Sequence, residues 1–402
     1  MRVLLDCRMA SWTGIGRYTT TLARALNARG DIELVQVAAP DERPPVAKHE
    51  GAESILAGKH PFSLGGAREF GAIAGSVGAD VVHCAHFPTP MPPSHPLVVT
   101  IHDLMPLLVP GIMSSPFKRA VYRYWNGRAA KHADLIITPS QSTAADVERT
   151  FAAALGKTRI TPEAADEFAQ GPMGQLPPAL VEVSDWPYLL SMGSTRKHKD
   201  LPTLLRAFAR VAATRPELRL LLVGADDRPF VDSALQGAPP QLRDQVFFTG
   251  RVDDSQLRTL MAGAQLFAFP SLYEGFGLPP LEAMAFGAPC VVADAASLPE
   301  VVGDAALLFP PGDDIALAEA LERLLGDPGL REDMREAGYR RVAAFSWAYT
   351  ADETVAVYHE VVGGGGAGEA APSAVQSEPA GPREHEDAGA YSDGVLGDDP
   401  QG

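Results

Sequence analysis

The chain has 402 residues, a length that predicts roughly two to three domains. Hydrophobic residues make up 46% of it and charged residues 21%, which excludes a fully disordered or fibrous protein. The formal net charge of -16 argues against a protein that grips nucleic acid through its phosphates. No apolar run reaches the roughly 20 residues of a membrane span, and the first residues predict a strand rather than a signal peptide.

Apolar runs typical of buried parallel strands alternate with amphipathic helical stretches through most of the chain. In the first half we expect strands at 3–5, 32–37, 80–84, 97–101 and 134–138, with helices at 17–26 and 117–131. In the second half we expect strands at 188–192, 218–223, 246–248, 266–269 and 289–292, with helices near 201–213, 254–262 and 280–286. This alternation predicts an α/β fold of doubly wound parallel sheets.

So many strands rarely share one sheet, which predicts two Rossmann-like domains facing a cleft. The Gly- and Pro-rich segment 171–187 marks the boundary between a domain at 1–180 and a domain at 181–345. Helical patterns follow at 314–326, 330–345 and 347–362, and we expect 346–362 to form a C-terminal helix that packs back on the first domain. Residues 363–402 carry a net charge of -7 and almost no large apolar residues, so we expect a disordered acidic tail.

The three cysteines, Cys7, Cys84 and Cys290, are odd in number and far apart. This usage favours reduced thiols in a cytoplasm over a disulfide framework. Cys7 and Cys290 fall in or beside predicted buried strands, where a free cysteine is most often core filler.

Ligands of open parallel sheets bind at the carboxyl ends of the strands, so the loops there are the candidate sites. After the first strand, Gly14 and Gly16 precede a helix whose free amides favour an anion. Thr19 stands where a dinucleotide fingerprint would need its third glycine, so the loop weakly predicts a nicotinamide site and also fits a tight turn without a ligand. His102 ends the strand in "VVTIHDL", where it fits either a structural role or a contact with substrate.

Two loops of the second domain carry charge. Arg196, Lys197, His198 and Lys199 follow its first strand and precede a helix, a placement that favours a phosphate over a merely solvated basic face. In "FAFPSLYEGFGLPPLEAMAFGAPCVVAD", a glycine loop joins a strand to a helix expected to start near residues 279–280. We expect Glu282 in the first turn of that helix, as a dipole partner or as an acceptor for a ribose diol.

The segment "EGFGLPPLEAMAFGAPCVVAD", with seven residues between its two glutamates, resembles the signature of retaining, nucleotide-sugar-dependent glycosyltransferases of the GT-B fold, family 4. The resemblance extends over most of residues 1–362 through "GIGRYT", "VVTIHDL", "ADLIITPSQST", "GSTRKHKDL" and "FFTGRVDDSQL". It implies transfer of a hexose from a nucleotide sugar to a hydroxyl acceptor.

The resemblance implies roles for the charged residues of the second domain. Glu274 would contact donor sugar hydroxyls and Glu282 the nucleotide ribose, while Arg196 and Lys199 would hold the diphosphate. Many relatives carry Pro-Arg-Lys or Pro-His-Lys before the helix, and this chain departs from them by lacking the proline. The glycine loop would help to hold the diphosphate through backbone amides, at Gly275, Phe276, Gly277 and Leu278.

The same resemblance implies roles for the first domain and the nucleobase. Gly14 and Gly16 would let the first loop approach the phosphate and the acceptor, and His102 would touch the transferred sugar. Val252, after "TG", looks like the nucleobase contact. The acceptor would be selected by first-domain loops such as 41–70.

Charge considerations predict transfer without a metal or other cofactor, the nucleotide sugar being a co-substrate. Fixed cations and a helix N-terminus can stabilise the departing diphosphate. The chain has no Asp-x-Asp triplet, which metal-dependent transferases usually carry. The family is thought to use front-face attack within an ion pair, so no carboxylate nucleophile is assigned.

Several alternatives stay open at this point. The loops look most like the mannosyltransferase branch, which uses GDP-mannose, but a UDP or dTDP donor fits as well. An epimerase or hydrolase of the same fold and a non-catalytic partner protein are the other candidates. The segment 117–132 mixes aromatic and basic residues, which fits a weak contact with the inner face of a membrane or a helix packed on the first domain with a solvated basic face: Lys118, Arg119, Arg123, Arg128 and Lys131.

Overall fold

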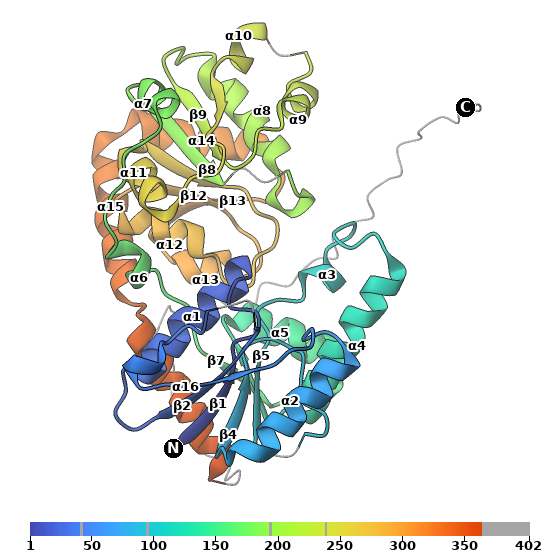
Figure 1. The fold of residues 1–402 in the computed structure, drawn as a ribbon. Coiled ribbons are helices and arrows are strands. Elements are labelled where there is room, and N and C mark those ends of the chain that lie inside the picture. Colours follow the sequence, from blue (N-terminus) through green and yellow to red (C-terminus); the bar gives the residue numbers. More distant parts are fainter. Residues whose placement is uncertain (41–42, 94–95, 193–194, 238, 364–402) are drawn as a thin grey trace, which may run out of the picture. The chain divides into compact units, whose positions relative to one another are not determined.

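The computed structural model describes residues 1–40, 43–93, 96–192, 195–237 and 239–363, all within one compact unit (Figure 1). The predicted acidic tail lies outside the described residues apart from Gly363. Two wholly parallel sheets account for all the described strands, which confirms the α/β prediction and the two Rossmann-like domains.

The first sheet has seven strands in the order β3-β2-β1-β4-β5-β6-β7. In chain order these strands are β1 Arg2–Asp6, β2 Glu33–Ala38, β3 Glu53–Leu56, β4 Val81–Cys84, β5 Leu97–Thr100, β6 Leu135–Thr138 and β7 Thr158–Ile160. The helices of this part are α1 Thr13–Asn27, α2 Leu64–Val77, α3 Met105–Leu108, α4 Pro116–His132, α5 Gln141–Thr150, α6 Asp166–Ala169 and α7 Pro178–Ser184, with 3-10 turns η1 Lys48–Glu50 and η2 Ala152–Ala154.

The second sheet has six strands in the order β10-β9-β8-β11-β12-β13, the strand order of a dinucleotide-binding fold. These strands are β8 Tyr188–Met192, β9 Arg219–Val223, β10 Val246–Phe248, β11 Leu266–Phe269, β12 Cys290–Ala293 and β13 Ala306–Phe309. The helices are α8 Leu201–Ala212, α9 Arg228–Ala234, α10 Pro240–Arg243, α11 Asp254–Gly263, α12 Leu278–Ala285, α13 Leu298–Val302, α14 Asp314–Gly326, α15 Pro328–Ala343 and α16 Trp347–Val362, with a 3-10 turn η3 Lys197–Lys199.

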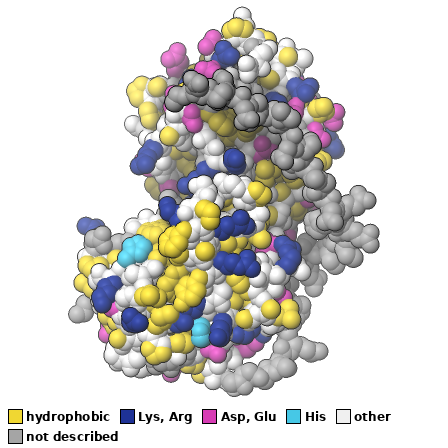
Figure 2. Space-filling model, turned by 90° about the vertical axis from the view of Figure 1, so that its right-hand side faces the viewer, with side chains coloured by type: hydrophobic (Ala, Val, Ile, Leu, Met, Phe, Trp, Pro, Cys, Tyr) yellow, Lys and Arg dark blue, Asp and Glu magenta, His cyan; other side chains and the backbone are white. Residues whose placement is uncertain are grey.

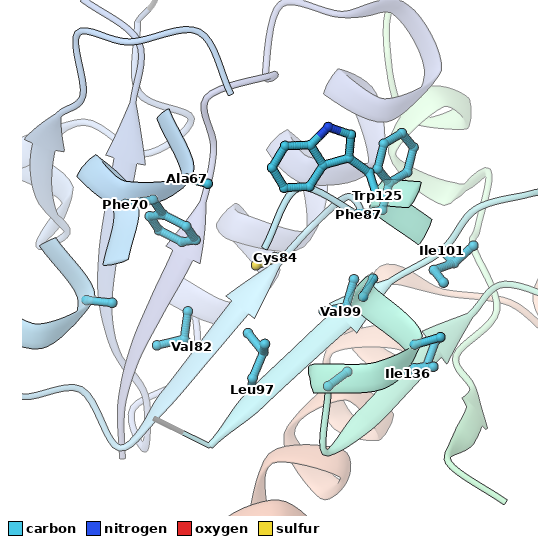
Figure 3. Packing of buried hydrophobic residues seen from close by; sticks show 14 of the residues in the cluster. Ala67, Phe70, Val82, Cys84, Phe87, Leu97, Val99, Ile101, Trp125 and Ile136 are labelled. Carbon is cyan, nitrogen blue, oxygen red and sulfur yellow. The ribbon is translucent and has the colours of Figure 1, made fainter. Parts of the chain in front are cut away.

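The core of the first sheet follows from strand alternation. Val82 and Cys84 of β4 point to one face, where they join Phe70 of α2 and Trp125 of α4 (Figure 3). His83 points to the opposite face, which α16 covers through contacts with β4, β5 and β6. The predicted C-terminal helix therefore lies on the first sheet although it follows the second one in the chain.

A fully buried polar chain connects α16 to α1 across that face. Nδ1 of His83 and the hydroxyl of Tyr358 lie 2.6 Å apart, and Nε2 of His83 lies 2.8 Å from Oγ1 of Thr100. The hydroxyl of Tyr18 lies 3.1 Å from the same Thr100 oxygen. Burial lowers the pKa of His83 to about 3, with a smaller contribution from His102, so the ring is neutral near pH 7.

Helix α2 was not predicted, because its four glycines disfavour a helix in isolation. The packing explains two of them. A Cβ on Gly66 would stand 2.1 Å from the carbonyl oxygen of His60, and one on Gly71 would stand 2.2 Å from that of Met91. The helix lies so close to these chain segments that only glycine fits.

Candidate active site

Two loops of the second domain meet at the carboxyl ends of β8 and β11. The Leu272 amide donates to the carbonyl of His198 at 2.7 Å, and the Ser271 hydroxyl oxygen lies 3.1 Å from the same carbonyl oxygen. These contacts bring Nζ of Lys199 to 2.6 Å from Oε1 of Glu274. The structure therefore joins the lysine and the glutamate that the sequence assigned separately to the diphosphate and to the sugar.

The environment of this pair fixes both side chains. The Ser271 hydroxyl donates to Oε1 of Glu274 at 2.5 Å, and the Lys199 ammonium lies 5.0 Å from the centre of the Phe269 ring. Both hydrogen bonds described for the carboxylate end on Oε1, which leaves Oε2 for a ligand. Arg196 is exposed one residue before η3.

The glycine loop and α12 follow directly. Gly277 caps the helix with φ of 113°, a conformation that glycine favours, and α12 begins at Leu278. The Ser297 hydroxyl oxygen lies 2.7 Å from the Phe276 carbonyl oxygen, to which it donates, and 2.9 Å from that of Glu274. The glycine loop is thus supported by the start of α13.

Gly275 lies directly against the first domain. A Cβ there would stand 2.0 Å from the carbonyl oxygen of His102. The Ser140 and Thr143 hydroxyls, which begin α5, donate to the Gly275 carbonyl at 2.6 and 3.0 Å. The structure thus brings the glycine loop and the His102 segment together.

His102 follows β5 and is mostly buried. Its Nε2 lies 2.9 Å from the Ala85 carbonyl, so this nitrogen carries a proton. Nδ1 lies 3.4 Å from Oε1 of Glu163, and the ring of Tyr18 meets the imidazole edge-on with centroids 4.6 Å apart. Glu163 was missed by the sequence reasoning, since it lies in no recognisable motif.

Glu282 is in the second turn of α12 rather than the first, because the helix begins earlier than expected. Glu282 is only 3% exposed, and its Oε1 lies 2.5 Å from Nη1 of Arg17 in α1. Burial raises the pKa of Glu282, and the nearby Arg17 partly offsets this rise. Arg17 stands in the segment "GIGRYT", which lies in α1, and no role was predicted for it.

Gly14 and Gly16 lie inside α1, which begins at Thr13, and not in a loop before the helix as predicted. The two glycines disfavour a helix in isolation and hid its start in the sequence. This first turn serves packing. The Gly16 amide donates to the Trp12 carbonyl at 2.5 Å, and a Cβ on Gly16 would stand 2.2 Å from the Ala10 carbonyl oxygen. Gly14 has open space around its Cβ position. Gly16 and Arg17 line a cavity of about 500 Å³ with residues of α6 and α11, whereas Lys199 and Glu274 are not among its lining residues.

The predicted nucleobase contact lies in a loop of the second domain. Val252 is half-buried two residues before α11, in the loop after β10. Among the described residues, no three His, Cys, Asp or Glu side chains gather as a metal site would need. Metal-independent transfer stays a prediction.

Family models match both domains. The model "Glycosyltransferase Family 4" covers residues 12–167, and "Glycosyl transferases group 1" covers residues 175–341. The chain belongs to the family 4 glycosyltransferases. The sequence-based identification of the family is confirmed.

Known relatives and solved structures agree with this family. The chain is 32% identical over 263 residues to the serotype-specific mannosyltransferase WbdA of Escherichia coli, a match over 63% of this chain and 32% of that one. It is 31% identical over 283 residues to the MMP alpha-(1->4)-mannosyltransferase of Mycolicibacterium hassiacum, over 66% of each chain. The chain thus spans about a third of the length of the WbdA relative.

The solved structures show the fold. Sucrose-phosphate synthase from Thermosynechococcus elongatus superposes with a TM-score of 0.73 at 24% identity, over 90% of this chain and 99% of that one. HepE of Anabaena, in complex with UDP and glucose, superposes with a TM-score of 0.67 at 19% identity, over 89% of this chain and 98% of that one. This likeness confirms the GT-B fold of this family 4 member.

Proposed function

We propose that the protein is a retaining glycosyltransferase that moves mannose from GDP-mannose to a hydroxyl acceptor. The pairing of Lys199 with Glu274 beside the N-terminus of α12 carries the proposal. It holds a cation for the diphosphate and a carboxylate for the sugar side by side at the carboxyl ends of β8 and β11. The mannosyltransferase names of the two relatives support the choice of sugar.

In the proposed reaction, the bond between the anomeric carbon and the diphosphate oxygen breaks and its electron pair leaves with the nucleoside diphosphate. Lys199 and the first amides of α12 face this growing negative charge. Because they are already in place, they stabilise the charge without reorganisation. Glu274 orients the sugar by accepting from its hydroxyls at Oε2.

The acceptor oxygen then forms the new bond to the anomeric carbon and gives its proton to the departing diphosphate oxygen on the same face of the sugar. His102 lines this reaction centre from the first domain, and Gly275 lies against its carbonyl. The Nε2 bond to Ala85 fixes the ring, so Nδ1 is the nitrogen that can face a hydroxyl, with Glu163 beside it. No carboxylate is assigned as a nucleophile.

A second candidate is transfer from a UDP or dTDP sugar. The HepE structure with UDP and glucose has the same fold, so the experiment includes UDP and dTDP sugars as donors. Purified protein is incubated with GDP-mannose, UDP-glucose or dTDP-glucose, and the melting temperature is recorded for each. Release of nucleoside diphosphate is then measured with and without a mannose-containing acceptor. Stabilisation and turnover with GDP-mannose alone support the proposal, and turnover with UDP-glucose alone overturns the choice of donor.

A non-catalytic role is the other alternative. It predicts binding of a nucleotide without turnover in any of these mixtures. Loss of turnover in Glu274→Gln, with nucleotide binding retained, would assign the measured activity to this site rather than to a contaminant.

We place the enzyme in the cytoplasm, with a weak contact to anionic membrane through α4. Helix α4 buries Trp125 in the core, so this tryptophan is unavailable to a membrane. Phe117, 77% exposed, and Tyr124 stand with basic residues on the outer side of the helix, where Figure 2 shows hydrophobic and basic side chains intermixed. Among the described residues, no helix has the length and apolar character of a membrane span. Sedimentation with vesicles containing phosphatidylglycerol, compared for Phe117→Ser and the parent, tests this contact.

A further inference from the structure

A second cavity lies wholly within the first domain. It has a volume of about 340 Å³ and lies where β1, β2 and β3 end, lined among others by Arg8, Trp12, Pro40, Lys59 and His60. The donor residues of the second domain take no part in it. Its position at the carboxyl edge of the sheet is where an open α/β fold places a ligand.

Trp12 gives this cavity an aromatic wall. The residue is 39% exposed, although tryptophan is usually well buried. Its indole is stacked on Phe62 with ring centroids 5.6 Å apart and an interplanar angle of 29°. One face of the indole is therefore supported by Phe62, while the exposed part offers a rigid flat surface to a ligand.

The loop opposite Trp12 is firmly held. The carboxylate of Glu69 accepts from the Gly58 amide at 3.0 Å and from the Lys59 amide at 2.9 Å. Nδ1 of His60 accepts from the Phe62 amide at 3.3 Å, so in the neutral ring the proton is on Nε2. Lys59 and His60 thus offer hydrogen-bond donors beside the aromatic wall, as a polyhydroxyl ligand requires.

The floor of the cavity is less suited to a phosphate. Arg8 is fully buried, and its Nε and Nη2 donate to the two oxygens of Asp6 at 2.8 and 2.6 Å. Nη1 donates to the Gly66 carbonyl at 3.2 Å. The charge of Arg8 is balanced by Asp6, so the floor does not supply the strong positive potential that binds a dianion.

A row of rings connects this cavity to the reaction centre. Phe62 meets His86 with centroids 6.0 Å apart, and His86 meets His102 at the same 6.0 Å. Nδ1 of His86 is buried and has no hydrogen-bond partner among the described residues. In this row the rings of Phe62 and His86 stand between Trp12 and His102, so the Trp12 cavity is a different place from the position of the transferred sugar.

We propose that the Trp12 cavity binds a sugar unit of the acceptor other than the one that carries the attacking hydroxyl. The apolar C–H face of that sugar stacks on Trp12, and Lys59 and His60 donate to its hydroxyls. The acceptor is then a glycan of at least two units. This inference rests on the proposed transferase function and names its acceptor class.

The test compares acceptors of different length. Initial rates are measured with methyl α-mannoside, mannobiose and mannotriose for the wild type, Trp12→Ala and Trp12→Phe. Trp186→Ala is the matched control, because Trp186 is also exposed, at 46%, but lies against Arg219 in the second domain. We expect Trp12→Ala to raise the KM of the longer acceptors about tenfold, as for the loss of one aromatic contact, with kcat nearly unchanged.

The KM for methyl α-mannoside should not move in Trp12→Ala, and Trp12→Phe should recover part of the loss. Equal changes for all acceptors, or no change for any, overturn the proposal, as does a fall in kcat alone. Hydrolysis of the donor in the absence of acceptor is measured in parallel. Donor hydrolysis without transfer to any mannoside refutes the glycan acceptor and keeps the transferase, whereas loss of both refutes the transferase itself.

Binding gives a readout that is independent of turnover. Tryptophan fluorescence is followed as mannobiose or inorganic phosphate is added. A change with mannobiose that is present in Trp186→Ala and lost in Trp12→Phe supports the subsite. A change with phosphate alone, abolished by Lys59→Ala, would overturn the sugar assignment in favour of an anion.

Discussion

Replacement of Arg17 by alanine should destabilise the protein, because it leaves a buried carboxylate without its cation. The residue Glu282 is 3% exposed, and Nη1 of Arg17 lies 2.5 Å from its Oε1. Removal of one partner of a fully buried ion pair costs about 3–5 kcal/mol. The side chain of Arg17 is itself 34% exposed, so solvent screens part of the interaction and we expect ~2 kcal/mol.

The pH dependence of this loss follows from the direction of the pKa shift. Burial raises the pKa of Glu282 and Arg17 opposes that rise, so Arg17→Ala raises the pKa further. A carboxyl group with a raised folded pKa contributes stability at low pH that is lost as the pH rises through that pKa. The penalty of Arg17→Ala should therefore be larger at pH 8 than at pH 5.

Thermal unfolding of the wild type and of three variants, Arg17→Ala, Glu282→Gln and Arg17→Ala/Glu282→Gln, measures the coupling. A loss of ~2 kcal/mol corresponds to a fall in Tm of about 4–8 °C when one domain of roughly 150–250 residues unfolds as a unit, and to a smaller fall when both domains unfold together. Glu282→Gln removes the buried charge, so Arg17→Ala/Glu282→Gln should melt above Arg17→Ala. If the double variant is no more stable than Arg17→Ala at pH 8, the carboxylate is not the origin of the loss and the reasoning is wrong.

Four further predictions concern turnover, two buried polar groups and a metal. Lys199→Ala should lower kcat by about 10²–10³ and raise the donor KM less, because its charge is needed most as the diphosphate departs; equal effects on kcat and KM would argue against this role. The neutral His83 should make stability fall as the pH drops below about 6.5 toward 3, by about 1.4 kcal/mol per pH unit for one proton, since the unfolded histidine binds a proton that the folded one does not. Tyr358→Phe should lower the free energy of unfolding by about 1–3 kcal/mol, because Nδ1 of His83 loses its partner; a melting curve like that of the wild type would refute this. Activity should survive EDTA, and abolition by chelator with recovery on added magnesium would refute the metal-free mechanism.

The interior strands were predictable because they are buried on both faces. β11 is a continuous apolar run, β1 has one at its centre, and β4 is apolar apart from His83; the predicted positions of all three agree with the structure to within a residue at each end. The strands that were missed, β3, β7 and β13, lie at sheet edges. An edge strand is half solvated, so its residues need not form an apolar run, as the exposed ends of β3 show.

The candidate site was predictable only where a motif carried it. Both glutamates and Lys199 stand in recognisable segments, and the structure places Lys199 on Glu274. Other residues that contact His102 and Glu274 were not predicted. Glu163 meets His102 only through the folded chain, and no spacing in the sequence connects the two. Ser271 stands three residues before Glu274 in the quoted segment, but a lone serine at this spacing does not by itself indicate a hydrogen bond to the carboxylate.

Arg17 shows why the charge of a site cannot be counted from its motif alone. The family signature contains Glu282 but not the cation that neutralises it, which comes from the opposite domain. A ribose diol that bonds to this carboxylate must share it with Arg17 or displace the arginine. The cost of that exchange enters the affinity for every donor nucleotide. Glu282→Gln should consequently weaken nucleotide binding by less than the loss of a free carboxylate would, because Arg17 already holds part of its hydrogen-bonding capacity. Titration of the nucleotide into Arg17→Ala/Glu282→Gln and Glu282→Gln separates the two contributions, and identical affinities would show that Arg17 has no part in donor binding.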